Sequence, residues 1–387
     1  MALAGARILQ VIPRLDAGGA ERTTVEVAAA LKAAGAKALV ASEGGRLTRE
    51  LEAAGAELIE MPNAGSKNPL TVLSHASWLR KLIRARKVDL VHARSRAPAW
   101  SALWAARGAK VKFVTTYHGV YSSGGALKRL YNSVMARGDV VIANSEYTAG
   151  HVRAEHPFAT SRIVTIPRGV DMAAFRPEAV GNERIAKLSK QWRIKPEKPA
   201  LLILLPGRMT SWKGHREAVE AAKIISKRDL PPWRMIFAGD AQGRDEYCME
   251  VQTAITGAGL EDRIELVGHC DDMPAALSLA DLVIAPSNRA EAFGRVAAEA
   301  GAMGKPAIGS DLGGQREIIV SGETGWLTPP GNAEALAEAM AGVLAMTPEA
   351  RASMGRAAEA RIAAKFTTAA LQRATLDVYD RLIGRPA

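Results

Sequence analysis

Short apolar runs alternate with longer helical patterns along the whole chain. In the first half, seven runs rich in β-branched residues predict strands, at 6–13, 37–42, 56–61, 88–93, 112–117, 139–144 and 162–167. In the second half, five similar runs predict strands at 200–208, 234–240, 263–268, 281–287 and 306–311. Between the runs, apolar residues recur three and four positions apart, which predicts amphipathic helices. This alternation predicts an α/β fold with parallel sheets covered by helices on both faces.

A polar, turn-rich stretch near residues 176–183 predicts the boundary between two domains, and a linker is expected at 195–200. We therefore expect two doubly wound, Rossmann-like domains, residues 1–180 and 181–365, that face each other across a central cleft. The last helical stretch, about 348–383, has no following strand. Its end, residues 366–387, is expected to pack back on the first domain. Ligands of such sheets bind beyond the carboxyl ends of the strands.

Composition limits the class of protein. The chain has 387 residues, and no apolar run approaches the roughly 20 residues that a membrane-spanning helix needs. The N-terminal residues lack the basic flank and cleavage site of a signal peptide and are expected to form a first strand. Two cysteines, Cys248 and Cys270, are too few for a zinc motif or a disulfide framework. A cytoplasmic location is therefore expected.

Charge is distributed unevenly. Residues 1–185 contain 26 Lys and Arg against 15 Asp and Glu, a net charge of +11, whereas residues 186–387 contain 25 of each kind. The basic half predicts an anionic partner: a phosphorylated substrate, a membrane surface or nucleic acid. A basic, solvated surface without any partner gives the same count.

Two loops of the first half carry candidate chemistry. Gly18 and Gly19 follow the first strand, where backbone N–H groups at a helix start can bind an anion. The full G-x-G-x-x-G spacing is missing, which disfavours a dinucleotide site. His118 follows the strand 112–117 and is a candidate hydrogen-bond donor to a substrate. A lone histidine or glycine pair has a structural role as often as a functional one.

Two loops of the second half complete the pattern. Arg208 and Lys213 precede a helix expected to start near Gly214, which describes a diphosphate-binding site made without a metal. In the stretch EAFGRVAAE, Glu291 and Glu299 would be about 12 Å apart if all nine residues were helical. If the helix begins near residue 294 instead, both acids can face one ligand. One carboxylate would bind a sugar and the other a ribose, as in dinucleotide sites.

Taken together, these motifs resemble the retaining glycosyltransferases of family four, which have the GT-B fold. The stretch 291–299 matches the E-x7-E motif of that family. GRMTSWKG, AGD at 238–240, VGHCDDM at 267–273 and the block at 310–332 match as well. GGAER at 18–22 and YHG at 117–119 are N-terminal matches. The resemblance spans nearly the whole chain.

This resemblance implies a role for each matching residue. It implies an acceptor-binding first domain, a donor-binding second domain, and front-face transfer from an α-linked nucleotide sugar to an α-glycoside. No metal and no cofactor are expected; a UDP-sugar is the favoured donor and GDP-mannose the next. The catalytic candidates are His118 and Glu291; the donor-binding candidates are Gly18, Gly19, Arg208, Lys213, Gly268, His269, Met273, Phe293, Gly294, Arg295, Val296 and Glu299; the acceptor-binding candidates are Arg94, Arg96 and Tyr117.

The acceptor is expected to be an anionic glycan or glycolipid. The RSR and PAW elements within residues 94–100 look like those of glycosyltransferases that build lipopolysaccharide cores. Basic amphipathic helices are predicted at 72–88 and 124–137, and such helices can lie on the inner face of the cytoplasmic membrane. Ordinary domain helices with basic outer faces give the same pattern.

Other functions stay open. A transferase acting on a soluble acceptor or an exopolysaccharide, or a nucleotide-sugar epimerase, would share much of the pattern. A phosphorylase would need a cofactor lysine and a longer chain, and a periplasmic binding protein would need a signal peptide. Nucleic acid is not an expected partner, because no recognised motif accompanies the charge.

Overall fold

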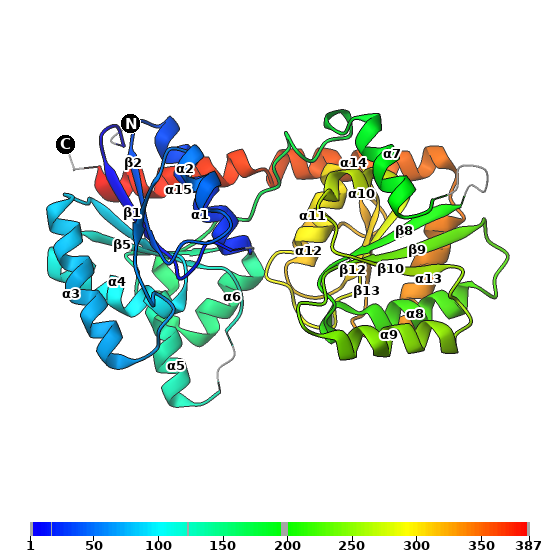
Figure 1. Cartoon of the computed structure of the whole chain (residues 1–387), viewed down its shortest axis with the longest axis horizontal. Coiled ribbons are helices and arrows are strands. Elements are labelled where there is room, and N and C mark those ends of the chain that lie inside the picture. Colours follow the sequence, from blue (N-terminus) through cyan, green and yellow to red (C-terminus); the bar gives the residue numbers. More distant parts are fainter. Residues whose placement is uncertain (1–2, 17, 122–123, 195–199, 385–387) are drawn as a thin grey trace. The chain divides into compact units, whose positions relative to one another are not determined.

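The computed structural model describes residues 3–16, 18–121, 124–194 and 200–384 (Figure 1). Contacts divide the chain into two compact units, residues 1–169 with 368–387, and residues 170–367. Each unit contains one parallel sheet and its own hydrophobic core. None of the helices in the described ranges is long and apolar enough to cross a membrane.

The first unit contains a seven-stranded parallel sheet in the order β3-β2-β1-β4-β5-β6-β7. Its strands are β1 (Arg7–Val11), β2 (Lys37–Ser42), β3 (Glu57–Glu60), β4 (Leu90–Ala93), β5 (Lys112–Tyr117), β6 (Val140–Ala143) and β7 (Ile163–Thr165). The direction of winding reverses between β1 and β4, so that the loops after these two strands open side by side.

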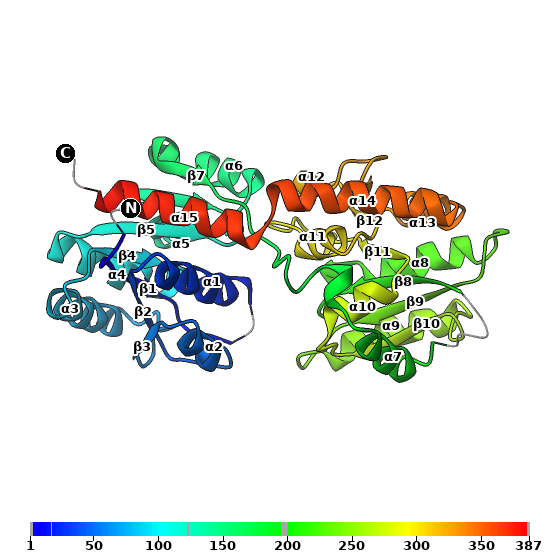
Figure 2. The same ribbon diagram turned by 90° about the horizontal axis from the view of Figure 1, so that it is seen from above.

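Helices cover both faces of this sheet. Its helices are α1 (Gly19–Ala33), α2 (Thr48–Ala53), α3 (Pro69–Ala85), α4 (Arg96–Ala109), α5 (Ala126–Asn132), α6 (Glu146–Glu155) and α15 (Thr368–Ile383), with 3₁₀ turns η1 (Ser133–Ala136) and η2 (Pro157–Arg162). One face packs on α1, α2 and α15, and the other on α3, α4 and α6. The last helix, α15, lies alongside α1 in both ribbon views (Figures 1 and 2). There the Gln372 side chain donates to the backbone carbonyl of Glu26.

The second unit repeats the plan with six parallel strands in the order β10-β9-β8-β11-β12-β13. Its strands are β8 (Leu201–Pro206), β9 (Trp233–Ala238), β10 (Ile264–Gly268), β11 (Leu282–Ala285), β12 (Ala307–Ser310) and β13 (Gly325–Thr328). Here the winding reverses between β8 and β11, which are hydrogen-bonded neighbours.

The helices of the second unit also form two layers. They are α7 (Asn182–Gln191), α8 (His215–Ile225), α9 (Asp245–Gly257), α10 (Met273–Leu279), α11 (Arg295–Ala302), α12 (Gln315–Ile318), α13 (Ala333–Leu344) and α14 (Pro348–Lys365), with 3₁₀ turns η3 (Pro177–Ala179) and η4 (Ser211–Lys213). One face of the sheet packs on α8, α9 and α13, and the other on α7, α10, α11 and α14 (Figure 1).

The predicted strands are confirmed, and one strand was missed. All twelve predicted runs contain a strand, within a few residues of the predicted bounds. The missed strand, β13, has only four residues, GWLT, and begins with a glycine. It pairs with β12 in parallel register, and a Cβ on Gly325 would lie 2.1 Å from the Ala307 carbonyl oxygen. A strand defined by close backbone approach leaves little apolar pattern in the sequence.

The contact boundary between the units also differs from the predicted one. It falls at 169/170 instead of 180/181. The reason is that Val170 pairs with Thr367 and packs, with Val180, in the core cluster of the second unit. The final helical stretch is two helices, because Phe366 turns into that core between α14 and α15. Of the predicted linker, residues 195–199 lie outside the described residues.

Candidate active site

The loops after β8 and β11 meet where the second sheet changes direction. Because β8 and β11 are parallel neighbours, both loops leave the sheet at its carboxyl edge. The loop after β8 carries Arg208 and η4, which ends at Lys213. The loop after β11 carries Ser287 and Glu291 and leads into α11. Topology therefore brings together residues that are 78 positions apart in sequence.

Glu291 is held by three side chains through one of its oxygens. Lys213 Nζ lies 2.7 Å from Oε1 and Ser287 Oγ donates to the same atom at 2.6 Å. Gln315 Nε2 donates to it at 3.2 Å and also to the Ala285 carbonyl at 3.1 Å. The Lys213 and Glu291 side chains are only 12% and 11% exposed. Among the described residues these three contacts all end on Oε1, and none of them involves Oε2.

Two helices next to this pair begin at left-handed glycines. Gly214 (φ 80°) precedes α8 and Gly294 (φ 95°) precedes α11. A Cβ on Gly214 would lie 2.0 Å from the Pro286 carbonyl oxygen, and one on Gly294 would lie 3.0 Å from the Gln315 side chain. Neither helix has a side-chain N-cap, so the first-turn N–H groups are available to an anion. The expectation that α11 begins near Gly294 is confirmed.

Glu299 lies one turn into α11 and is separate from Glu291. It is 8% exposed, and one of its oxygens accepts a 2.7 Å hydrogen bond from Arg295 Nε. Burial raises the pKa of Glu299, and the Arg295 guanidinium acts in the opposite direction. The two acids of the E-x7-E stretch therefore have different cationic neighbours, Lys213 and Arg295.

The remaining predicted donor-site residues differ in their surroundings. Arg208 is exposed in the loop after β8, whereas the Phe293 ring is buried against Phe366 and leaves only its backbone to a ligand. Val296 is half-buried in the first turn of α11. The predicted donor-binding segment 268–273 starts at Gly268 (φ 71°), at the end of β10.

That segment is shaped by acids. His269 Nε2 lies 3.0 Å from Asp271, and both side chains are exposed. Asp272 caps α10, whose first residue is Met273, by accepting from the Ala275 backbone N–H. Two hydrogen bonds from Arg184 lower the pKa of Asp272.

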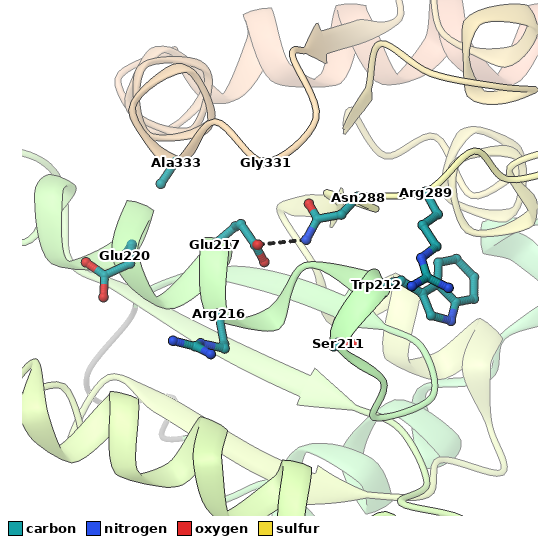
Figure 3. Close-up of a pocket in the computed structure, with 9 residues that line it drawn as sticks. All are labelled: Ser211, Trp212, Arg216, Glu217, Glu220, Asn288, Arg289, Gly331 and Ala333. Atoms are coloured by element: carbon teal, nitrogen blue, oxygen red, sulfur yellow. Dashed lines mark hydrogen bonds between the residues drawn. The ribbon is translucent and has the colours of Figure 1, made fainter.

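A cavity of about 490 Å³ borders the same two loops (Figure 3). It is lined by Ser211, Trp212, Arg216, Glu217, Glu220, Asn288, Arg289, Gly331 and Ala333. Figure 3 shows the Asn288 amide directed at Glu217, to which Nδ2 donates at 2.6 Å. None of the predicted site residues lines this cavity; it reaches their loops through the neighbouring residues Ser211, Trp212, Asn288 and Arg289.

In the first unit, the loops after β1 and β5 place Gly18, Gly19 and His118. Gly18 is the N-cap of α1 and, as a glycine, offers no side-chain cap. His118 Nδ1 lies 3.2 Å from Arg168 Nη2, while Nε2 is buried without a hydrogen-bond partner among the described residues. Burial, and then the Arg168 and Arg94 guanidinium groups, lower the pKa of His118.

The three predicted acceptor residues are buried or half-buried. Arg94 is 2% exposed, and both Nε and Nη2 donate to Gln10 Oε1, at 2.8 and 2.6 Å. It therefore lies within the first unit instead of on an open surface. Arg96 is half-buried, donates to Asn132 Oδ1 at 2.8 Å and lies 4.0 Å above the Tyr121 ring centroid. Tyr117 is 1% exposed, and burial raises its pKa.

Comparison with known proteins identifies the family. Residues 186–361 match the model of glycosyl transferases group 1, and residues 17–174 match that of Glycosyltransferase Family 4. A crystal structure of a glycosyltransferase from Rickettsia africae ESF-5 is 34% identical, covering 99% of this chain and 100% of that chain with a TM-score of 0.91. The chain belongs to glycosyltransferase family 4.

Other relatives of this glycosyltransferase are more distant. N-acetyl-alpha-D-glucosaminyl L-malate synthase of Bacillus anthracis is 28% identical, covering 69% of this chain and 68% of that protein. The lipopolysaccharide core biosynthesis mannosyltransferase LpcC of Rhizobium leguminosarum bv. viciae is 28% identical, covering 65% and 67%. HepE of Anabaena, solved in complex with UDP, is 23% identical over 97% of this chain and 100% of that chain with a TM-score of 0.81, a likeness of fold alone. The two Rossmann-like units form the GT-B fold.

Three polar residues of the glycosyltransferase were missed by sequence reasoning. Ser287 and Gln315 hold Glu291, and Arg168 contacts His118. A signal for Gln315 was present, because it lies inside the motif block at 310–332. Ser287 ends a predicted strand and Arg168 follows another, positions where a polar residue at a carboxyl edge can reach a ligand.

Proposed function

We propose that the protein is a retaining, metal-independent hexosyltransferase. It moves a sugar from a nucleotide-sugar donor to an acidic envelope glycan, a lipopolysaccharide core or another glycolipid, and forms an α-glycosidic bond. The observation that carries the proposal is the Lys213–Glu291 pair, held by Ser287 and Gln315 at the edge where β8 and β11 meet. This pair supports the proposal because a cation that could bind a leaving group adjoins a carboxylate that could bind a sugar hydroxyl.

In the proposed reaction, Lys213 and Arg208 bind the diphosphate and stabilise the charge that develops as it leaves. The N-termini of α8 and α11 add backbone N–H donors to the same anion. The diphosphate oxygen that departs takes the proton of the acceptor hydroxyl, and the new bond forms on the face from which the leaving group departs. Protein cations thus supply the stabilisation that a metal ion would otherwise give.

Glu291 and Glu299 have separate tasks in this proposal. Oε2 of Glu291 accepts a hydrogen bond from a hydroxyl of the transferred sugar, because Oε1 is already occupied by three donors. Glu299 accepts from the ribose hydroxyls and stays oriented by Arg295. A UDP-sugar is the first donor to test and GDP-mannose the second; the latter is supported by the similarity to a core mannosyltransferase.

A membrane-bound acceptor is supported by the outer surface of the first unit. Helices α3, α4 and α5 lie side by side. Ser101 Oγ of α4 donates to the Val72 carbonyl of α3, and Trp100 Nε1 of α4 donates to the Tyr131 carbonyl of α5. Large apolar side chains are exposed on these helices: Leu70, Leu73, Trp78, Trp104, Leu127 and Leu130. Basic residues accompany them on α3, among them Arg80, Lys81 and Arg84. We propose that this surface docks on the anionic inner face of the cytoplasmic membrane.

The division of labour between the two acids tests the site. Glu299→Ala is expected to weaken binding of the bare nucleotide diphosphate by about tenfold or more, because a charge-assisted hydrogen bond is lost before any reaction. Glu291→Ala should leave that affinity nearly unchanged and lower turnover instead. Calorimetric titration with UDP and GDP, together with donor turnover, measures both quantities. Equal losses of nucleotide affinity in the two variants would refute the assignment.

A further inference from the structure

Arg168 connects the start of α1 to His118 within the first unit. Its Nη2 lies 3.2 Å from His118 Nδ1. A Cβ on Gly19 would lie 1.6 Å from Arg168 Nη1 and 2.1 Å from Cζ. The guanidinium therefore rests directly on the Gly19 backbone, at the only kind of residue that leaves room for it. Its position is fixed by contacts on both sides.

The contact with Arg168 decides which nitrogen of His118 carries hydrogen. A guanidinium has only donors, so Nδ1 must accept the hydrogen bond, and a neutral ring then carries its hydrogen on Nε2. Burial and the neighbouring guanidinium groups lower the pKa of His118, which keeps the ring neutral. Nε2 is buried and has no hydrogen-bond partner in the described part of the chain. An unsatisfied buried donor is costly, and a ligand oxygen would relieve that cost.

Stabilisation of α1 does not explain this placement. The positive end of the helix dipole lies at Gly19, and a cation there opposes the dipole. The helix dipole therefore does not account for an arginine at this end of α1.

We propose that Arg168 is a positioning residue that fixes the Nε2–H tautomer of His118, so that His118 donates a hydrogen bond to an oxygen of the transferred sugar. This inference takes its substrate, the transferred sugar, from the proposed function. The tautomer of His118 does not depend on that function. Arg168 does not touch the substrate in this arrangement; it acts through the ring of His118.

Nitrogen NMR of the histidine rings in the full-length protein tests the proposed tautomer of His118 directly. At pH 7, His118 Nδ1 should show the shift of a bare ring nitrogen and Nε2 that of an N–H; comparison with His118→Asn identifies these signals among the seven histidines. Arg168→Met should produce a mixture of tautomers and raise the pKa of His118, because a neighbouring cation is removed. Arg168→Lys keeps a donor and a charge and should restore much of the wild-type pattern. A wild-type Nδ1–H tautomer, or an unchanged pattern in Arg168→Met, overturns the inference.

Turnover tests whether the Arg168-fixed tautomer of His118 contributes to catalysis. Arg168→Met should lower kcat for donor cleavage by roughly 10- to 100-fold and leave the affinity for UDP or GDP unchanged. The acidic limb of the pH profile of kcat should shift to higher pH, because the pKa of His118 rises. The matched control is Arg162→Met, which removes hydrogen bonds to the Gly138 and Ala136 carbonyls without touching His118. An unchanged kcat in Arg168→Met despite an altered tautomer, or an equal loss of kcat in Arg162→Met, overturns the catalytic role of Arg168. If the wild type cleaves no nucleotide sugar, the proposed function has failed, and the NMR result still decides the tautomer.

Discussion

Glu291 receives its three donors from three separate segments: η4, the loop after β11 and the start of α12. The ammonium of Lys213, the hydroxyl of Ser287 and the amide of Gln315 all reach Oε1. Gln315 is itself fixed by accepting from the Ser310 backbone N–H at 2.6 Å. The carboxylate is therefore oriented before any ligand arrives, which is the condition for efficient positioning.

Lys213→Ala tests both the orientation and the leaving-group role. We expect turnover to fall at least about 100-fold and unfolding free energy to fall by about 1–3 kcal/mol, since a partly buried carboxylate loses a charged partner. In a Glu291→Gln background the same substitution should destabilise less, because the charge pair is already gone. Urea unfolding and donor turnover measure these effects, and wild-type turnover should survive EDTA.

The control for that substitution is Lys223→Ala, an exposed lysine on the neighbouring helix α8. It should change neither stability nor turnover appreciably. A strict requirement for a divalent metal, or full activity of Lys213→Ala, would contradict the assignment of Lys213.

At the residue scale, the sequence predicted the charged pair Lys213 and Glu291 and missed its neutral supports. Both residues follow predicted strands, and the resemblance of their motifs to family four predicted that they bind a nucleotide sugar. Gln315 could not be placed in the same way, because it reaches Glu291 only through the parallel pairing of β11 with β12. The burial of Arg94 could not be read from the sequence, because its partner Gln10 is on another strand, 84 residues away.

At the scale of elements, two helix starts depend on glycine. Gly214 and Gly294 lie at φ 80° and 95°, a region that side chains with a Cβ rarely adopt. These conformations let α8 and α11 begin next to the Lys213–Glu291 pair. Their positions followed from the sequence, because a glycine before an amphipathic segment indicates such a junction.

Gly214→Ala should lower the free energy of unfolding by more than the backbone strain of an alanine at positive φ would. A methyl group at this position would lie 2.0 Å from the Pro286 carbonyl oxygen, so the β11 loop must move. Gly243→Ala is the matched control, because φ is 77° and nothing lies within 4 Å of the added carbon. We expect about 1 kcal/mol for the control and about 2–4 kcal/mol for Gly214→Ala, with loss of donor turnover only in the latter. Equal losses measured by urea unfolding would show that the close contact is unimportant.

The proposed membrane-docking surface formed by α3, α4 and α5 can be tested with liposomes. Wild-type protein should co-sediment with anionic liposomes and be released by salt, since surface charges are screened beyond about 8 Å at physiological ionic strength. Leu70→Ser with Leu127→Ser should weaken this binding, because both side chains are largely exposed, at 76% and 85%. Reversal of Arg80, Lys81 and Arg84 to Glu should weaken it as well, with unchanged affinity for nucleotide.

A control for membrane docking is Met249→Ser, an exposed apolar side chain on α9 of the other unit. It should leave sedimentation unchanged. Indifference of the wild type to anionic liposomes would contradict the membrane proposal and leave the transferase assignment intact.

At the scale of the molecule, two parallel sheets with one pattern of winding determine where chemistry can lie. In each sheet the winding reverses once, between β1 and β4 and between β8 and β11, and the candidate residues follow those strands or their neighbours. Strand runs and helix periodicity predicted this architecture. They could not predict that residues 170–180 pack with the second unit, because that choice depends on contacts with Phe366 and Thr367 far along the chain.

The anomeric form of the released sugar tests the central claim most directly. Purified protein is incubated with α-linked UDP-sugars and GDP-mannose without acceptor, and proton NMR follows the sugar in the first minutes, before mutarotation. A retaining transferase that activates water in place of the acceptor should release the α anomer first, and Lys213→Ala should release almost none. Release of the β anomer first, or no cleavage of any nucleotide sugar by the wild type, would contradict the account.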